Sequence, residues 1–257
     1  MCRLFGYRSR EPTGVQHELL EAANALRVQS REHPDGWGLG WYVGGAPQVV
    51  RALEPAHSDD DFAAVGEKLA STTVIAHVRK ASVGRIALDN THPFEWGRWL
   101  FVHNGTVPQW ERARPVLEAA IDPRLRPLLR GETDSERCFL LFLTRLAAAC
   151  DPEAASFDAA AQALGETVAL VRAASDHGEG KPASTTFLVT DGRLMLACRS
   201  GRTLFLETTQ PAADGSVLAV AIASEQPCSC EGRVFREVPE GAIVGVDPQL
   251  RLRESAL

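Results

Sequence analysis

The sequence has no long hydrophobic run, and its first residues lack the apolar stretch of a signal peptide. A helix that crosses a bilayer needs about 20 mainly apolar residues in succession, and no such segment occurs among the 257 residues. An excess of positive charge is also missing, because 27 lysines and arginines stand against 33 acidic residues with the two signs well mixed. Nucleic-acid binding needs a basic surface patch. We therefore expect a cytoplasmic protein whose main task involves neither membranes nor nucleic acid.

The cysteines lack the regular spacing of a disulfide framework. There are six of them, namely Cys2, Cys138, Cys150, Cys198, Cys228 and Cys230. In a reducing compartment we expect all six to be free thiols. Cys228 and Cys230 form a lone Cys-x-Cys pair, which is more often a pair of loop thiols than a metal site.

Histidines at zinc-binding spacings are absent as well. The four histidines nearest to the motifs described below are His33, His77, His92 and His103. Their spacings match no common zinc pattern such as His-Glu-x-x-His. The sequence therefore disfavours a metal-dependent hydrolase, and we expect neither a metal nor any other cofactor.

Helices and strands are both indicated by the periodicity of the apolar residues. Helices are predicted at 17–29, 59–70, 110–120, 134–150 and 157–174, the fourth with a cap at Thr133. Strands are predicted at 2–7, 48–53, 73–78, 99–102, 186–190, 194–198, 203–206, 217–223, 233–238 and 242–246, and a glycine-rich loop from Asp35 leads into one more that ends at Tyr42.

The connections between these elements are short, and neither a repeat nor a low-complexity linker interrupts the chain. Gly44-Gly45 and Asp191-Gly192 are placed where hairpin turns are expected. The fold class is therefore α+β, and we expect one domain over residues 1–257. Two sheets sandwiched between layers of helices would bury all the predicted elements.

Cys2 is the most informative position for function. A small second residue permits removal of the initiator methionine, which would place a thiol and a free α-amine on the same residue. An α-amine has a pKa of about 7.7–8.0, so it can accept the thiol proton and later protonate a leaving amine. A cysteine near a terminus is otherwise often a small core residue, and other motifs must favour the catalytic interpretation.

Three further segments supply groups that such a nucleophile needs. Asn104 and Gly105 follow a predicted strand, and a side-chain amide with a backbone N–H can form an oxyanion hole. Arg79 ends another strand, where a guanidinium can bind a carboxylate through two hydrogen bonds, and Asp134 opens a helix. Taken singly, these are more often a tight turn, a surface charge and a helix-end charge. Their joint occurrence favours a catalytic site.

The same segments make the sequence resemble the class II glutamine amidotransferase family, whose fold is that of the N-terminal nucleophile hydrolases. The matching segments follow the family's order at 1–6, 35–38, 77–82, 90–94, 103–105 and 131–136. The resemblance implies a four-layer αββα sandwich of two mainly antiparallel sheets. It also indicates a stand-alone branch of the family, because no synthase domain follows within the chain.

The resemblance implies roles for individual residues. Cys2 would be the nucleophile and, through its amine, the base, while Asn104 and Gly105 would form the oxyanion hole. Arg79, Ser82 and Asp134 would hold the amino-acid end of the substrate, the first two at its α-carboxylate and the third at its α-ammonium. Further residues expected in a flap or beside the site are Gly36, Trp37, His92 and His103, with Trp37 as an aromatic lid.

One departure from the family concerns the carboxylate end of the pocket. Relatives of the glutamine–fructose-6-phosphate type carry histidine where this sequence has Val83, after Ser82. We therefore expect this end of the pocket to have a different shape.

The implied reaction is attack of the thiolate on a γ-amide, formation of a γ-glutamyl thioester, and hydrolysis to glutamate. The substrate would be glutamine or another small γ-glutamyl compound. Ammonia would pass to a separate synthase partner, or the released amine would itself be the product, as for the γ-glutamyl hydrolase of ergothioneine biosynthesis. We favour the second, since a glutaminase without an acceptor would waste glutamine. A catalytically silent scaffold is disfavoured because every expected reactive group is present.

Overall fold

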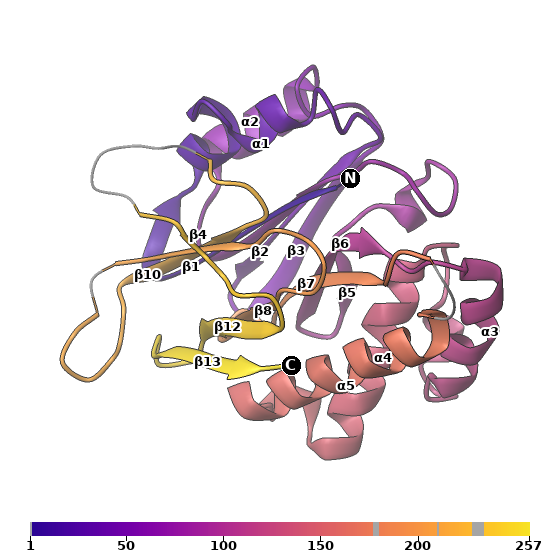
Figure 1. Ribbon diagram of the computed structural model, residues 1–257. Coiled ribbons are helices and arrows are strands. Elements are labelled where there is room, and N and C mark those ends of the chain that lie inside the picture. The colour runs from indigo at the N-terminus through magenta and orange to yellow at the C-terminus, as the bar shows by residue number, and fades with distance from the viewer. Residues whose placement is uncertain (1, 177–179, 210, 228–233) are drawn as a thin grey trace.

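The computed structural model describes residues 2–176, 180–209, 211–227 and 234–257, and it contains two sheets packed face to face (Figure 1). Helices cover the outer face of each sheet. The strand pairs within the described ranges are antiparallel. This arrangement confirms the α+β class and the four-layer αββα sandwich.

The first sheet holds the N-terminal strand at its centre. Its seven strands are, in spatial order, β11 (Arg236–Glu237), β9 (Phe205–Thr208), β10 (Ala219–Ala223), β1 (Arg3–Gly14), β4 (Ala70–Val78), β2 (Trp37–Val43) and β3 (Ala46–Ala52). Strand β1 pairs with β4 through Arg3 and Val78, and with β10 through Phe5 and Ala223. The residues next to Cys2 are therefore held rigidly from both sides.

The second sheet carries the predicted oxyanion segment near its edge. Its six strands are, in spatial order, β13 (Leu252–Ala256), β12 (Ala242–Val246), β8 (Met195–Cys198), β7 (Ser184–Thr190), β6 (Trp99–Thr106) and β5 (Phe94–Trp96). Strands β5 and β13 were not predicted from the sequence. Both are short strands at the sheet edges, where pairing with a neighbour decides the conformation more than local periodicity does.

The helices divide between the two outer faces (Figure 1). The first sheet is covered by η1 (His17–Glu21), α1 (Leu26–Gln29) and α2 (Asp60–Lys68), and the second by α3 (Trp110–Ala120), α4 (Asp134–Ala149) and α5 (Phe157–Ser175). Three short 3₁₀ turns lie in the connections, η2 (Leu88–Asn90), η3 (Arg126–Leu128) and η4 (Pro152–Ala154). None of the helices in the described part of the chain combines the length and apolar character needed to cross a membrane.

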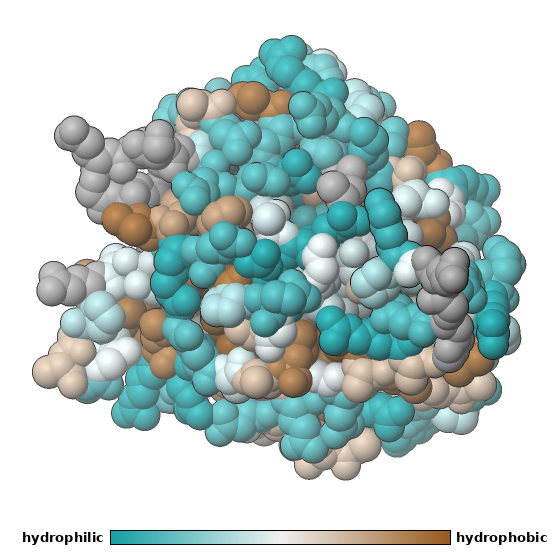
Figure 2. All heavy atoms as spheres, viewed as in Figure 1, coloured by the Kyte–Doolittle hydropathy of each residue, from teal (hydrophilic) through white to brown (hydrophobic). Residues whose placement is uncertain are grey.

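The apolar core is divided into three layers by the two sheets. Leu4, on β1, packs between the sheets, whereas the next residue, Phe5, packs beneath the helices of the first sheet. Successive side chains of a strand point to opposite faces, so Cys2 belongs to the face that looks toward the second sheet. The surface shown in Figure 2 is mainly hydrophilic, with apolar residues in small separate groups.

The helix predicted over 17–29 is broken in the structure. Ala22 and Ala25 have extended backbones, with ψ of 150° and 158°, between η1 and α1. The Asn24 backbone N–H donates to the carbonyl of Pro227 at 2.9 Å, and both alanines are buried. A contact with a distant segment thus replaces the helical hydrogen bonds that periodicity alone predicts.

Most of the remaining predicted elements are found with small changes of boundary, but the first strand, predicted to end at Tyr7, continues as β1 to Gly14. The helix predicted to end at 70 ends at Lys68, because β4 begins at Ala70. Thr133 caps α4, as predicted, by accepting a hydrogen bond from the Glu136 N–H at 3.3 Å. The four cysteines in the described ranges are free thiols, while Cys228 and Cys230 lie outside those ranges.

Candidate active site

A small pocket at one end of the sandwich brings together residues from distant parts of the sequence. It is lined by Cys2, Arg79, Lys80, Ser82, Val83, His92, His103, Gly105, Thr133, Asp134 and Ser135. Five residues predicted to contact or attack the substrate are in this set. They reach the pocket because β1 starts, β4 and β6 end, and α4 starts at the same end of the molecule.

The Cys2 sulfur lies beside the backbone of Lys80. The Lys80 N–H donates to Sγ at 3.3 Å, and the Lys80 carbonyl oxygen is 3.5 Å from the same sulfur. Burial raises the pKa of the Cys2 thiol, and this outweighs the opposing effects of the Lys80 N–H and the Arg79 charge. The thiol is therefore protonated at neutral pH, and a base must take its proton before it can attack.

Arg79 is almost fully buried at the end of β4. Its guanidinium donates to the carbonyl oxygens of Val83 and Arg85 at 3.1–3.2 Å. Burial lowers the pKa of Arg79, while nearby Cys2 and Asp134 raise it. An arginine remains charged under these conditions, so it provides a fixed cation next to the nucleophile.

The segment around Gly36, predicted as a flexible flap, instead anchors Arg79. The Arg79 N–H donates to the Gly36 carbonyl at 2.8 Å, and the Asp35 N–H donates to the Arg79 carbonyl at 3.0 Å. The Asp35 carboxylate also accepts a hydrogen bond from the Ala81 N–H at 2.8 Å. Sequence reasoning missed this positioning role of Asp35, although the residue lies in one of the six matching segments.

Trp37 is not a lid over the pocket, and this part of the prediction is wrong. Its side chain is fully buried on the outer face of the first sheet, with its ring edge against Phe62 at 5.0 Å between centroids. The indole N–H donates to the Asp59 carboxylate at 2.7 Å. The alternation of side chains along β2 sends Trp37 away from the second sheet, and hence away from Cys2.

Asp134 opens α4 with its carboxylate held by two backbone groups. One oxygen accepts from the Ser135 N–H at 2.9 Å and the other from the Val107 N–H at 2.8 Å. The carboxylate is buried and close enough to Cys2 and Arg79 to affect the pKa of both. A fixed anion and a fixed cation thus lie on the walls of one pocket, which suits a zwitterionic ligand.

Asn104 and Gly105, predicted to follow the strand, are instead part of it, near the end of β6 that faces the pocket. The Asn104 side chain is buried, and its Oδ1 has no hydrogen-bond partner within the described ranges. Gly105 lines the pocket directly. A Cβ at Gly105 would be 1.8 Å from the Ser184 carbonyl oxygen and 2.4 Å from His103 Nε2, so only glycine fits there.

His103 ties this segment to the start of α4. Its Nε2 is 2.8 Å from the Ser184 carbonyl oxygen, which can only accept, so Nε2 carries the proton. Its Nδ1 then accepts from the Ser135 hydroxyl at 2.9 Å. Burial lowers the pKa of His103 and keeps the ring neutral. His103 therefore positions the helix start that carries Asp134.

His92 lines the pocket, and its ring packs against that of His77 with centroids 4.2 Å apart and the ring planes tilted by 40°. Burial lowers the pKa of His77 to about 3 and that of His92 well below its ordinary value. His33 is also buried, and its pKa is lowered to about 4. The folded protein thus holds these rings neutral.

These neutral histidines predict a loss of stability in mild acid. The unfolded chain binds protons at a pKa of about 6.5, whereas folded His77 stays neutral down to about 3. The free energy of unfolding should therefore be highest above pH 6.5. Below that pH it should fall by about 1 kcal/mol per pH unit for each histidine. Urea unfolding at pH 7.5, 6 and 5 measures this slope. The variant His77→Gln should show a shallower slope, and equal slopes for both proteins would contradict the assignment.

Known proteins that resemble this chain belong to the family that the sequence motifs indicate. Residues 1–219 match the family model described as class II glutamine amidotransferases. The chain is 32% identical over 229 residues to the gamma-glutamyl-hercynylcysteine sulfoxide hydrolase of Mycobacterium tuberculosis, covering 85% of this chain and 84% of that protein. It is 28% identical over 226 residues to the probable glutamine amidotransferase DUG3 of Saccharomyces cerevisiae, covering 77% of this chain.

Some of these relatives are longer than the matched region. The chain spans 63% of the yeast protein and 55% of the putative glutamine amidotransferase YafJ of Escherichia coli. The solved structure of a glutamine aminotransferase class-II domain protein from Silicibacter pomeroyi has a TM-score of 0.66 at 22% identity, and the match covers 100% of this chain and 99% of that one. At this identity the likeness supports the fold.

Proposed function

Since the chain belongs to the class II glutamine amidotransferase family, we propose that it is an amidohydrolase in which Cys2 cleaves the γ-amide bond of a γ-glutamyl compound. The observation that carries this proposal is the meeting of three groups in one pocket. The thiol of Cys2, the cation of Arg79 and the anion of Asp134 come from separate segments and line the same small cavity. A γ-glutamyl group needs all three, one to attack its amide and two to hold its zwitterionic end.

The proposed reaction begins with transfer of the Cys2 thiol proton to the α-amine of the same residue, after removal of the initiator methionine. The sulfur attacks the γ-carbonyl carbon, and the Asn104 side-chain amide and the Gly105 N–H stabilise the oxyanion. The C–N bond then breaks, and the α-ammonium gives its proton to the departing amine. Water, activated by the α-amine, attacks the γ-glutamyl thioester and releases glutamate and the free thiol.

The raised pKa of the Cys2 thiol supports the need for an internal base in this scheme. The Lys80 N–H, 3.3 Å from Sγ, would stabilise the thiolate once the proton has left. In the same way the Arg79 charge favours the anionic sulfur. These two groups therefore offset part of the cost that burial adds to forming the thiolate, while the thiol stays protonated in the resting state.

Recognition of the amino-acid end would use the two buried charges and one hydroxyl. Asp134 would accept hydrogen bonds from the α-ammonium, and Arg79 would donate to the α-carboxylate, exchanging some of its bonds to loop carbonyls. Thr106 donates its hydroxyl proton to the Gly105 carbonyl at 2.7 Å, so Ser82 is the donor in its 3.2 Å contact with Thr106. On substrate binding, the Ser82 hydroxyl would turn this proton from Thr106 to the α-carboxylate, which can only accept.

We favour a γ-glutamyl conjugate over glutamine as the substrate. The Mycobacterium tuberculosis relative, 84% of whose length aligns with this chain, is named as a hydrolase of such a conjugate. The alternative is that glutamine is cleaved and its ammonia passes to a separate synthase partner, which is the mode of two-part amidotransferases. The two alternatives share the chemistry at Cys2 and differ in the leaving group.

A substrate panel separates these alternatives. Glutamate release should be measured for glutamine and for a series of γ-glutamyl amino acids and thiol conjugates, with the isolated protein. We expect at least one conjugate to have a kcat/KM at least about 10-fold above that of glutamine, because part of the binding energy comes from the leaving group. If glutamine is the best substrate, and its turnover rises when a synthase is added, the hydrolase proposal fails and the ammonia-donor alternative holds.

A further inference from the structure

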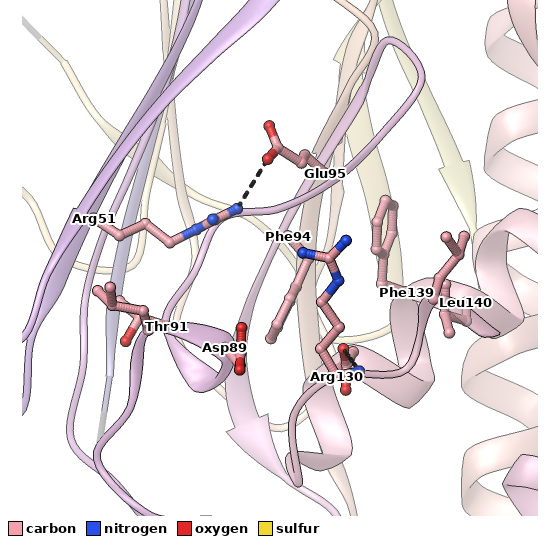
Figure 3. A pocket seen from close by; sticks show the side chains of 11 residues that line it. Arg51, Asp89, Thr91, Phe94, Glu95, Arg130, Phe139 and Leu140 are labelled. Atoms are coloured by element: carbon pink, nitrogen blue, oxygen red, sulfur yellow. Dashed lines mark hydrogen bonds and ion pairs between the residues drawn. The ribbon is translucent and has the colours of Figure 1, made fainter. Parts of the chain in front are cut away.

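A second cavity, of about 180 Å³, is larger than the one that holds Cys2. Figure 3 shows the residues that line this second cavity. It shares no lining residue with the Cys2 pocket. The two cavities are nevertheless lined by residues that are adjacent in the sequence. Thr91 and Glu136 line the larger cavity, and their neighbours His92 and Ser135 line the smaller one. The larger cavity has no part in the reaction proposed above.

The floor of this cavity is apolar. Phe94, from β5, and Phe139 and Leu140, from the second turn of α4, present their side chains to it (Figure 3). Phe94 and Phe139 are otherwise packed in the core beneath the second sheet. An apolar floor with a few polar groups at its rim is the usual character of a small-molecule site.

Several charged groups at the rim already have hydrogen-bond or ion-pair partners within the protein. The Arg51 guanidinium donates to the Pro93 carbonyl at 2.6 and 2.9 Å and lies 3.7 Å from the Glu95 carboxylate. The Glu136 carboxylate accepts from the Arg130 backbone N–H at 2.8 Å. Arg51 and Glu136 therefore hold the walls of the cavity in place.

Two opposite charges remain available for a ligand. Neither the Arg130 guanidinium nor the Asp89 carboxylate makes a side-chain hydrogen bond or ion pair with the residues that the structure describes. Figure 3 shows both side chains at the cavity, with Arg130 lying over the apolar floor and Asp89 between it and Thr91. Both act electrostatically on Arg51, which lines the same cavity.

We propose that this second cavity binds a small zwitterion with an apolar side group, such as a neutral α-amino acid. Its carboxylate would pair with Arg130, its ammonium with Asp89, and its side group would cover Phe94 and Phe139. One free cation and one free anion match the two charges of a zwitterion. A dianion would instead be repelled by Asp89, and a dication by Arg130. The inference goes beyond the proposed reaction and does not depend on it.

Calorimetric titration with leucine, methionine and phenylalanine tests this proposal. At least one should bind saturably to the wild-type protein and equally well to Cys2→Ala. Phenethylamine and 3-phenylpropionate, which each lack one charge of phenylalanine, should bind at least about 10-fold more weakly, as expected for loss of a charge-assisted hydrogen bond. The absence of saturable binding by all three amino acids at millimolar concentration would overturn the proposal.

Two variants of exposed residues assign the charges. Asp89→Asn should weaken amino-acid binding about 10-fold and leave 3-phenylpropionate binding unchanged, because that probe has no ammonium. Arg130→Gln should also weaken amino-acid binding, but it should leave the binding of phenethylamine unchanged, because that probe has no carboxylate. The matched control is Glu111→Gln, a carboxylate at the start of α3 that does not line the cavity. Unchanged amino-acid binding in both Asp89→Asn and Arg130→Gln would place the ligand elsewhere and overturn the assignment.

Discussion

Replacement of Cys2 by alanine is expected to abolish glutamate release, with a fall in kcat of at least about 10,000-fold, as for loss of other covalent nucleophiles. The sulfur is the atom proposed to form the thioester, and no other thiol lines the pocket among the described residues. The fold should survive, because Cys2 precedes β1 and its side chain contacts mainly the Lys80 backbone. Glutamate release and a thermal unfolding curve measure the two effects separately.

The matched control for this experiment is Cys150→Ala. Cys150 is another partly buried free thiol, at the C-terminal end of α4 and outside the Cys2 pocket. It should keep full activity. Intact-mass analysis of the active wild-type protein should show that Met1 has been removed, since the proposed base is the α-amine of Cys2. Turnover by Cys2→Ala would refute the nucleophile, and an active species that keeps Met1 would refute the base.

Replacement of Asp134 by asparagine is expected to lower kcat/KM for a γ-glutamyl substrate by about 100- to 1,000-fold, mainly through a higher KM. Removing one partner of a buried charge pair costs about 2–5 kcal/mol, because the other charge stays desolvated. Asparagine also loses one of the two oxygens that accept from Ser135 and Val107, so a moderate loss of thermal stability should accompany the change. Arg79 is a less selective test, since its guanidinium also holds the loop that follows it.

A chemical probe distinguishes lost recognition from a damaged site. Iodoacetamide is small and uncharged, so it should alkylate Cys2 in Asp134→Asn at a rate close to that in the wild-type protein. The control variant Asp151→Asn removes a carboxylate that caps the turn η4 away from the pocket, and its kinetics should not change. An unchanged KM in Asp134→Asn would show that Asp134 does not bind the substrate ammonium.

The local elements were determined largely by the sequence. The bounds predicted for α3 and β12 agree with the structure, and the hairpin between β2 and β3 turns at Gly44 and Gly45 as expected. These features depend on side-chain periodicity and on backbone angles of a few consecutive residues, which the sequence contains directly. The family motifs added the order of the candidate site residues, but not the way in which each one is held.

The arrangement around the site was decided by contacts between distant segments. The Lys80 N–H reaches the Cys2 sulfur across 78 positions of sequence because β1 and β4 pair in a particular register. Register and strand alternation likewise turned Trp37 into the core instead of over the pocket. Asp89 and Arg130 meet at one cavity only because η2 and the segment before α4 pack together, where the Glu132 N–H donates to the Asn90 side chain at 2.7 Å. Local patterns carry no information on such pairings, since their free energy arises only when the two sheets and the helices come into contact.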